Sequence, residues 1–237
     1  MSRGFFITGT DTGVGKTVVT AGLLAGLRAR GIEAVAMKPV QSGGVMVDRR
    51  LVSEDARFYL SLSGISLDPG DINCYCFPAP VSPHLAARRN GEEIEPDVIK
   101  ETFARLAGRY PMVLVEGAGG LCAPLREDGF TVAGLARELG LPLIVVARAG
   151  LGTINHTVLT VNWARHLGLT VRGIIVNGCS VAGPDELEQD NVRMIARMTG
   201  APVLGVLPRI PGLSVEENRP MNLLATMNAA VDWDSIT

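Results

Sequence analysis

Short apolar runs alternate along the chain with longer segments in which apolar positions recur every three or four residues. The runs are rich in valine, isoleucine and leucine, and they predict buried strands at residues 5–8, 34–38, 112–115, 143–147, 172–177 and 203–207. The periodic segments between them, several closed by a glycine, predict helices at residues 17–30, 96–108, 131–139, 153–167 and 186–198. This alternation is typical of an α/β fold with a mostly parallel sheet and helices on both faces.

The length of 237 residues fits a single domain over residues 1–237, because domains commonly hold roughly 100–200 residues. The stretches 43–50 and 64–83 look like loops over one edge of the sheet and are too short or too apolar for a domain linker. In parallel sheets, ligands bind beyond the carboxyl ends of the strands. The residues that directly follow each apolar run are therefore the candidates for chemistry.

Composition narrows the kinds of partner. With 47% hydrophobic residues the chain can bury a large core, and a net charge of −2 gives no field that would attract nucleic acid or an anionic membrane. The four cysteines are too few for a disulfide scaffold, and neither a signal-peptide core nor a membrane-length run of about 20 apolar residues is found. We expect a cytoplasmic protein with small-molecule partners, no nucleic acid and no membrane.

The strongest motif is the glycine- and threonine-rich stretch Gly9–Thr17, which follows a predicted strand and opens a predicted helix. In a phosphate loop (P-loop), backbone N–H groups surround phosphate oxygens, a lysine approaches the terminal phosphates and a hydroxyl meets Mg²⁺. Lys16 and Thr17 supply these two groups. Five residues separate Gly9 from Gly15, one more than in the common form, so a glycine-rich turn that binds nothing is the alternative. The context favours a nucleoside triphosphate.

Two charged residues end neighbouring apolar runs. Glu116 precedes the glycine-rich stretch 117–120 and could face Mg²⁺, although alone it could equally be a solvated strand-end acid. Lys38 brings a second cation to the edge of the sheet where Lys16 lies, and phosphoryl transfer requires such positive charge. The alternative is a strand-end lysine that only extends its ammonium into solvent. Asp55 begins a predicted helix, where an acid is ordinarily a capping residue.

Together, several short blocks resemble the dethiobiotin synthetase family in order and spacing over roughly residues 4–224. The blocks are residues 9–17, 38–43, 82–84, 115–120 and 152–156, with Asn177 after a later strand. The resemblance implies a P-loop NTPase fold, Mg²⁺ as cofactor and ATP as co-substrate. It also implies the reaction: CO₂ joins the two amines of 7,8-diaminononanoate into a cyclic urea, through a carbamate and a carbamic–phosphoric anhydride, with ADP and phosphate released.

The resemblance further assigns roles to residues, with Lys16 and Lys38 as catalytic groups that stabilise the phosphoryl group and the carbamate. Metal contacts fall on Thr17, Asp55 and Glu116. The nucleotide contacts comprise the loop residues Gly13, Val14, Gly15, Lys16, Thr17 and Val18, the metal-side residues Asp55 and Glu116, the strand-end residues Gly117, Ala118 and Gly119, and an adenine end of Asn177, Pro208, Arg209, Ile210 and Glu217.

On the substrate side, the resemblance assigns Thr12 and Ser42. It also assigns the helix start at Gly152, Thr153 and Asn155, which in this family meets the carboxylate tail of the diamine from the other subunit. A homodimer with a shared substrate site is therefore expected. The helix start is a fair carboxylate site on physical grounds as well, because its N–H groups are free to donate.

Three other functions fit part of the pattern. A partition- or division-type switch ATPase usually carries a lysine early in the loop, where Asp11 stands here, and residues 221–237 form no strongly basic amphipathic helix. A cobyrinate-diamide-type ligase would use similar ATP chemistry but usually carries a glutaminase domain. A non-catalytic nucleotide-binding module would need neither Glu116 nor Lys38.

Overall fold

The structure, a computed structural model that describes residues 4–237, is built around one six-stranded sheet. The strands are β1 (Gly4–Gly9), β2 (Ala34–Met37), β7 (Met112–Glu116), β8 (Leu143–Arg148), β9 (Val171–Cys179) and β10 (Val203–Pro208). Their order is β10-β9-β8-β1-β7-β2, and every pair is parallel. All six predicted strands and the parallel sheet are confirmed. The first three residues, included in the predicted domain and in the signal-peptide argument, lie outside the described part.

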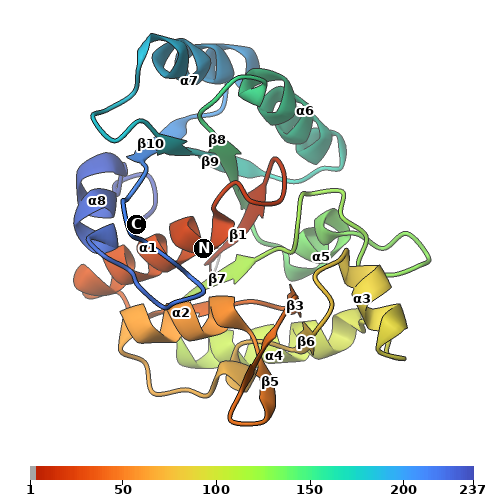
Figure 1. The fold of residues 1–237 in the computed structure, drawn as a ribbon. Coiled ribbons are helices and arrows are strands. Elements are labelled where there is room, and N and C mark those ends of the chain that lie inside the picture. The colour runs from red at the N-terminus through yellow and green to blue at the C-terminus, as the bar shows by residue number, and fades with distance from the viewer. Residues whose placement is uncertain (1–3) are drawn as a thin grey trace.

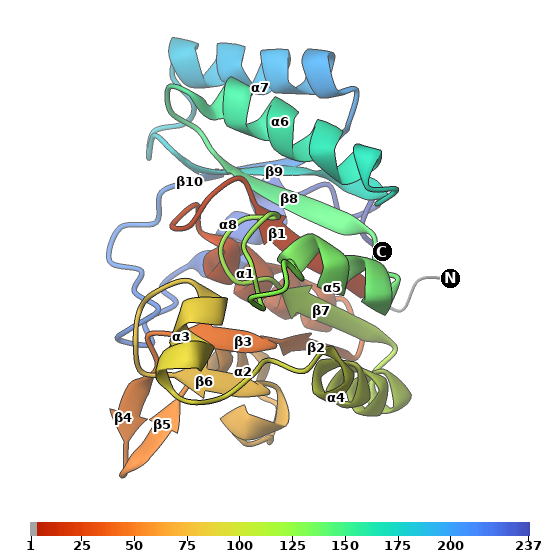
Figure 2. The ribbon, with the colours of Figure 1, turned by 90° about the vertical axis from the view of Figure 1, so that its right-hand side faces the viewer.

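Helices cover both faces of this sheet, as predicted (Figure 1). One face carries α1 (Lys16–Ala29), α2 (Glu54–Ser63) and α8 (Leu223–Ala230), and the other carries α4 (Pro96–Arg109), α5 (Val132–Leu139), α6 (Thr153–His166) and α7 (Glu186–Thr199). Figure 2 shows α6 and α7 side by side above the sheet. The short α3 (Pro83–Arg89) lies at the left of the same view, away from these two helices. The five helices expected from periodicity are all present.

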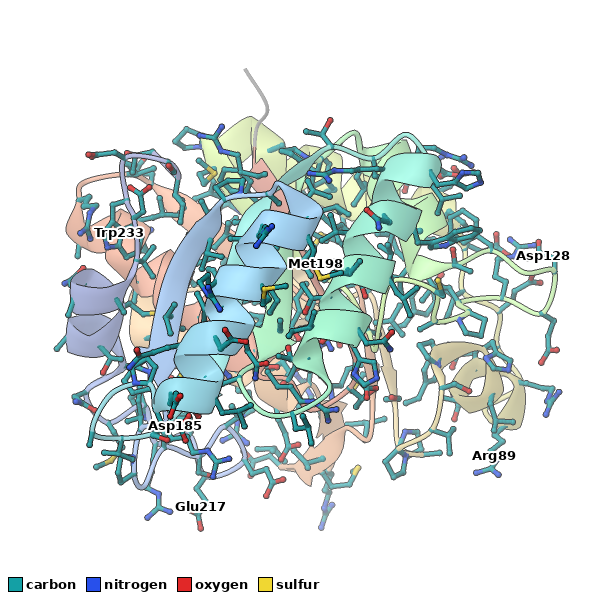
Figure 3. The ribbon with its side chains drawn as sticks, turned by 90° about the horizontal axis from the view of Figure 1, so that it is seen from above. Arg89, Asp128, Asp185, Met198, Glu217 and Trp233 are labelled. Atoms are coloured by element: carbon teal, nitrogen blue, oxygen red, sulfur yellow. The ribbon has the colours of Figure 1, made fainter. Side chains whose placement is uncertain are left out.

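The C-terminal segment packs on α1 through two glycines of that helix. A Cβ on Gly22 would lie 2.5 Å from Met227 Cγ, and one on Gly26 would lie 2.0 Å from the Trp233 ring. Figure 3 shows Trp233 at the rim of the molecule, beside α1. Because the helix has no side chain at these two positions, α8 and Trp233 can approach its backbone and cover it.

The two stretches predicted to be loops contain short strands, so that prediction was wrong in part. Residues 40–52 form β3 (Val40–Ser42) and the hairpin β4 (Val45–Val47) to β5 (Arg50–Val52), and β3 pairs in parallel with β6 (Tyr75–Phe77). A 3₁₀ turn, η1 (Pro69–Asp71), precedes β6. Strands of three residues are too short to give a readable alternation, which is why the pattern missed them.

Within residues 4–237, none of the helices combines the length and the apolar character needed to cross a membrane.

Candidate active site

A cavity of about 300 Å³ opens at the carboxyl ends of β1, β2 and β7, where the sequence predicted the chemistry. Its walls come from the phosphate loop, from the segment after β2, from α2 and from the glycine-rich loop after β7. The lining residues are Thr12, Gly13, Gly15, Lys16, Thr17, Lys38, Val40, Gln41, Ser42, Asp55, Glu116, Ala118, Gly119 and Val215. The structure therefore brings together the predicted phosphate, metal and catalytic residues, some of which lie more than a hundred positions apart in the chain.

The phosphate loop ends at Gly15, which is the N-cap of α1 and has a left-handed backbone with φ 91°. Lys16, only 6% exposed, donates from Nζ to the backbone oxygen of Asp11 at 2.9 Å. Burial lowers the pKa of Lys16 to about 8, although the nearby charge of Glu116 opposes this shift. The loop thus directs a cation and the N-terminus of a helix toward the same cavity, as an anion site requires.

A compact cluster of buried charge lies beside the loop. Lys38 Nζ is 2.6 Å from Asp55 Oδ2 and 2.6 Å from Glu116 Oε1, and Thr17 Oγ1 donates to the same Glu116 oxygen at 3.1 Å. Burial alone would lower the pKa of Lys38, but the charges of Asp55 and Glu116 raise it above the usual value for lysine. With Lys16 included, two cations face two carboxylates, so the cluster is neutral in formal charge.

The second oxygen of Glu116 has a partner that the sequence did not reveal. Tyr59, fully buried in α2, donates its hydroxyl to Glu116 Oε2. Burial, together with the Glu116 charge, raises the pKa of the Tyr59 phenol well above its usual value, so the hydroxyl keeps its proton. Both oxygens of this carboxylate are consequently held by donors from α1, α2 and the segment after β2.

The residues predicted to bind Mg²⁺ fit such an ion by their chemistry. Thr17, Asp55 and Glu116 offer one hydroxyl and two carboxylates on a single cavity wall, and Mg²⁺ prefers oxygen ligands. The two carboxylates already share a cation, because the Lys38 ammonium lies between them. The oxygen ligands therefore face the cavity, with their charge balanced by Lys38 and the nearby Lys16.

Asn177 lies in β9 and was predicted to contact adenine. In the structure its side-chain amide makes a hydrogen bond to the phosphate loop. Asn177 Nδ2 donates to the backbone oxygen of Val14 at 2.9 Å, and a Cβ on Gly15 would lie 2.1 Å from the same nitrogen. The side chain therefore holds the phosphate loop against β9, the second strand from β1 in the sheet. A role in supporting the loop follows from this contact, and an adenine contact stays a prediction.

Several predicted site residues do not line the cavity. Gly117 donates its N–H to Ile7 and packs against Phe6, and Val14 is buried in the core. The other predicted site residues that do not line the cavity, all within residues 4–237, are Val18, Gly152, Thr153, Asn155, Asn177, Pro208, Arg209, Ile210 and Glu217. Glu217 projects outward from the rim of the molecule and pairs with Arg219 (Figure 3). Val215, two residues earlier, is the part of this loop that reaches the cavity.

Sequence reasoning missed Val40, Gln41, Val215 and Tyr59. Val40 and Gln41 lie within the block 38–43, but no role at the site was predicted for them. Tyr59 follows Asp55 by four positions on α2, and residues four apart share one face of a helix. That spacing was the available signal for Tyr59.

A second hollow, of about 730 Å³, adjoins the first across the loop after β7. Apolar side chains from that loop and from α6 dominate its wall, with Leu121 and Ala123 on one side and Leu159 and Trp163 on the other. Leu159 is 61% exposed and Trp163 45% exposed, one helical turn apart. The loop after β7 thus contributes to both hollows, with Gly119 in the polar cavity and Gly120 in the apolar groove along α6.

The sheet order, the strand-to-helix phosphate loop and the acid at the end of β7 define a P-loop NTPase. Residues 3–217 match a family model described as an AAA domain. The fold is shared by a ParA family ATPase from Chlorobium tepidum TLS, with TM-score 0.59 and 15% identity over 96% of this chain and 97% of that one. It is also shared by the MinD cell division protein of Aquifex aeolicus, with TM-score 0.60 and 20% identity over 95% and 90%. At such identities the likeness shows the fold alone.

Closer relatives in sequence are ATP-dependent dethiobiotin synthetases. That of Anoxybacillus flavithermus is 47% identical over 215 residues, covering 91% of this chain and 96% of that relative. That of Bacillus subtilis (strain 168) is 41% identical over 214 residues, covering 90% of each. The chain belongs to the ATP-dependent dethiobiotin synthetase family. The resemblance seen in the sequence is confirmed, and the three alternative functions are not favoured.

Proposed function

We propose that this chain is an ATP-dependent ligase that closes the ring of dethiobiotin from 7,8-diaminononanoate and CO₂. The observation that carries the proposal is the meeting of Lys16, Lys38 and the Asp55–Glu116 carboxylate pair in one cavity at the phosphate loop. A loop that only binds nucleotide has no need of the second lysine. The names and identities of the relatives support the same reaction.

The reaction consists of three bond-forming steps. One amine of the diamine attacks CO₂ and loses a proton, giving a carbamate. A carbamate oxygen then attacks the terminal phosphorus of ATP, and the bond to the bridging oxygen breaks as ADP leaves. The second amine attacks the activated carbonyl carbon, the C–O bond to phosphate breaks, and the cyclic urea forms with loss of a proton. Each step moves negative charge that nearby cations can stabilise.

The chain supplies two such cations. Lys16, at the start of α1, holds the terminal phosphates together with the amides of Gly13 and Gly15. Lys38 lines the same cavity, together with Ser42 and Thr12 on the substrate side, and is assigned to the carbamate oxygen and the transferring phosphoryl group. Lys38 contacts the two carboxylates with two of its three ammonium N–H donors, which leaves one donor for the carbamate.

We assign the cofactor Mg²⁺ to Thr17, Asp55 and Glu116. When bound there, the ion neutralises charge on the phosphate oxygens of ATP. The protein contributes the oxygen donors, and Tyr59 and Thr17 restrain the Glu116 carboxylate before any ligand arrives. The adenine end is assigned to Asn177, Pro208, Arg209, Ile210 and Glu217, with Asn177 also fixing the loop through Val14.

We further propose a homodimer in which the carboxylate tail of the diamine meets Gly152, Thr153 and Asn155 of the other subunit. These residues begin α6, where helix N–H groups attract a carboxylate. The groove that adjoins the cavity, with Leu159 and Trp163 exposed on the same helix, supports burial of α6 against a second copy. The alkyl chain of the diamine is apolar and suits an apolar groove between the two subunits.

A charged side chain introduced on the exposed face of α6 tests the proposed dimer. Trp163→Glu is expected to weaken association by about 30-fold or more, since loss of a central aromatic contact typically costs about 2 kcal/mol or more. The KM for the diamine should rise as the fraction of monomer rises, because the site for the carboxylate tail is supplied by the other subunit. Sedimentation equilibrium and steady-state kinetics measure both effects.

Met198→Glu is the matched control, because Met198 is a similarly exposed apolar residue on α7 (Figure 3) and is not among the residues that line the groove. It should leave the association constant unchanged. A Trp163→Glu protein that stays dimeric with an unchanged KM would contradict the shared site.

The proposed activity itself is tested by ADP release from purified protein supplied with Mg-ATP and bicarbonate. Release should require 7,8-diaminononanoate, and a monoamine that lacks the second nucleophile should give no cyclic urea. ATP turnover that ignores the diamine would contradict the proposal. We place the enzyme in the cytoplasm, where ATP and bicarbonate are available.

A further inference from the structure

Glu116 differs from the other proposed metal ligands in how its side chain is restrained. A glutamate has one more rotatable bond than an aspartate, so its carboxylate samples more positions unless other groups hold it. In this structure Glu116 is 1% exposed, and Oε1 accepts hydrogen bonds from Thr17 and Lys38. Both of these donors also have proposed roles toward ligands. Neither of them is therefore reserved for the carboxylate.

Among residues 4–237, Tyr59 is the donor to Glu116 that does not line the cavity. Its side chain is fully buried in the main core, and its hydroxyl reaches Oε2, the oxygen that faces away from Thr17 and Lys38. The bond therefore persists whether Lys38 contacts the carboxylates or the substrate. It leaves Oε1 as the oxygen directed at the cavity.

Asp55 and Tyr59 lie four residues apart on α2, so they project from the same side of that helix. Asp55 contributes a carboxylate to the cavity wall, while Tyr59 reaches beneath it to the strand-end glutamate. Helix α2 consequently couples the two carboxylates: any movement of the helix moves one of them directly and the other through a hydrogen bond.

We propose that Tyr59 is a positioning residue for the metal site, which holds Glu116 by its rear oxygen so that its front oxygen meets Mg²⁺ at the phosphate loop. The inference rests on the metal assignment made under the proposed function. Partners of this kind, which contact a metal ligand and not the metal, typically change metal affinity or activity by about 10- to 100-fold when they are removed.

The test is Tyr59→Phe, which keeps the ring in the core and removes only the hydroxyl. Affinity for a non-hydrolysable ATP analogue is measured by calorimetry in excess Mg²⁺ and again in EDTA. The ratio of the two affinities reports how much Mg²⁺ strengthens nucleotide binding. In Tyr59→Phe this ratio is expected to fall by about 10-fold or more. Metal-free affinity should stay within about twofold, because the loop amides and Lys16 hold the phosphates without the metal.

Tyr110→Phe is the matched control. Tyr110 also packs against the core, but it ends α4, away from the cavity, so the ratio should equal that of the wild type. A merely structural role for Tyr59 would lower the melting temperature and reduce both affinities together. That result, or a fully retained ratio in Tyr59→Phe, would overturn the inference.

A wild-type protein whose nucleotide affinity ignores Mg²⁺ would overturn the metal assignment and the role of Tyr59 with it. None of these measurements contains the diamine or bicarbonate. Failure of this inference is therefore distinguishable from failure of the proposed ring closure, which is measured by product formation.

Discussion

Replacing Lys38 by methionine is expected to reduce turnover by about 10²- to 10³-fold, as loss of one pre-oriented group that stabilises transition-state charge typically does. Methionine keeps most of the side-chain volume but removes the ammonium that lies 2.6 Å from both Asp55 and Glu116. The buried Glu116 and the partly exposed Asp55 then lose the cation that contacts both, and only the nearby Lys16 remains. Loss of one partner from a buried ion pair typically costs about 3–5 kcal/mol of unfolding free energy, so the variant should also be less stable.

The same variant gives a sharper result when Mg²⁺ is added. If Thr17, Asp55 and Glu116 hold the metal, the ion replaces the missing positive charge, and the stability of Lys38→Met should recover more in Mg²⁺ than that of the wild type. Turnover should not recover. Urea denaturation with and without Mg²⁺, together with single-turnover kinetics, separates the two effects.

Lys100→Met is the control, because Lys100 is a half-exposed lysine that also contacts two carboxylates, Asp97 and Glu138, but on the surface of α4. It should change neither stability nor turnover appreciably. A Lys38→Met enzyme with near-normal turnover would remove Lys38 from the chemistry, and an unchanged unfolding free energy would contradict the importance of the buried pair.

Gly15→Ala is expected to disable nucleotide binding through the geometry of the loop. Gly15 has a left-handed backbone, which costs an alanine roughly 1–2 kcal/mol. Its new Cβ would lie 2.1 Å from Asn177 Nδ2, which must move and abandon its bond to Val14, at a further cost of about 0.5–1.5 kcal/mol. We expect about 2–3 kcal/mol of lost stability and at least about a tenfold weaker affinity for ATP.

Gly13→Ala separates the two causes. Gly13 also has a left-handed backbone, with φ 75°, but a Cβ there meets no atom within 4 Å. Only the backbone cost applies, so the loss of stability should be the smaller of the two. Equal losses in both variants, measured by urea denaturation and calorimetric titration of ATP, would show that the contact with Asn177 contributes nothing.

The sheet was predictable because its strands are buried on both faces and therefore form continuous apolar runs, as in β1 and β8. The phosphate loop was predictable because its glycines and Lys16-Thr17 are contiguous. Lys38 and Glu116 followed from a single topological rule, since residues that end parallel strands meet at one edge.

Tyr59 and Asn177 show where such reasoning stops. Each acts on the site through a contact between distant segments: Tyr59 with Glu116, 57 positions away, and Asn177 with Val14, 163 positions away. No local periodicity encodes these pairs. The short strands β3 to β6 were missed for a different reason, because three residues carry too little pattern to separate a strand from a loop.

The most direct test of the central claim is incorporation of ¹³C-bicarbonate into a cyclic urea by the purified protein, with Mg-ATP and 7,8-diaminononanoate, followed by mass spectrometry. The account predicts dethiobiotin with the label at the urea carbonyl, formed with one ADP per product and lost in Lys38→Met. ADP release without a labelled ring, or release that needs no diamine, would contradict it.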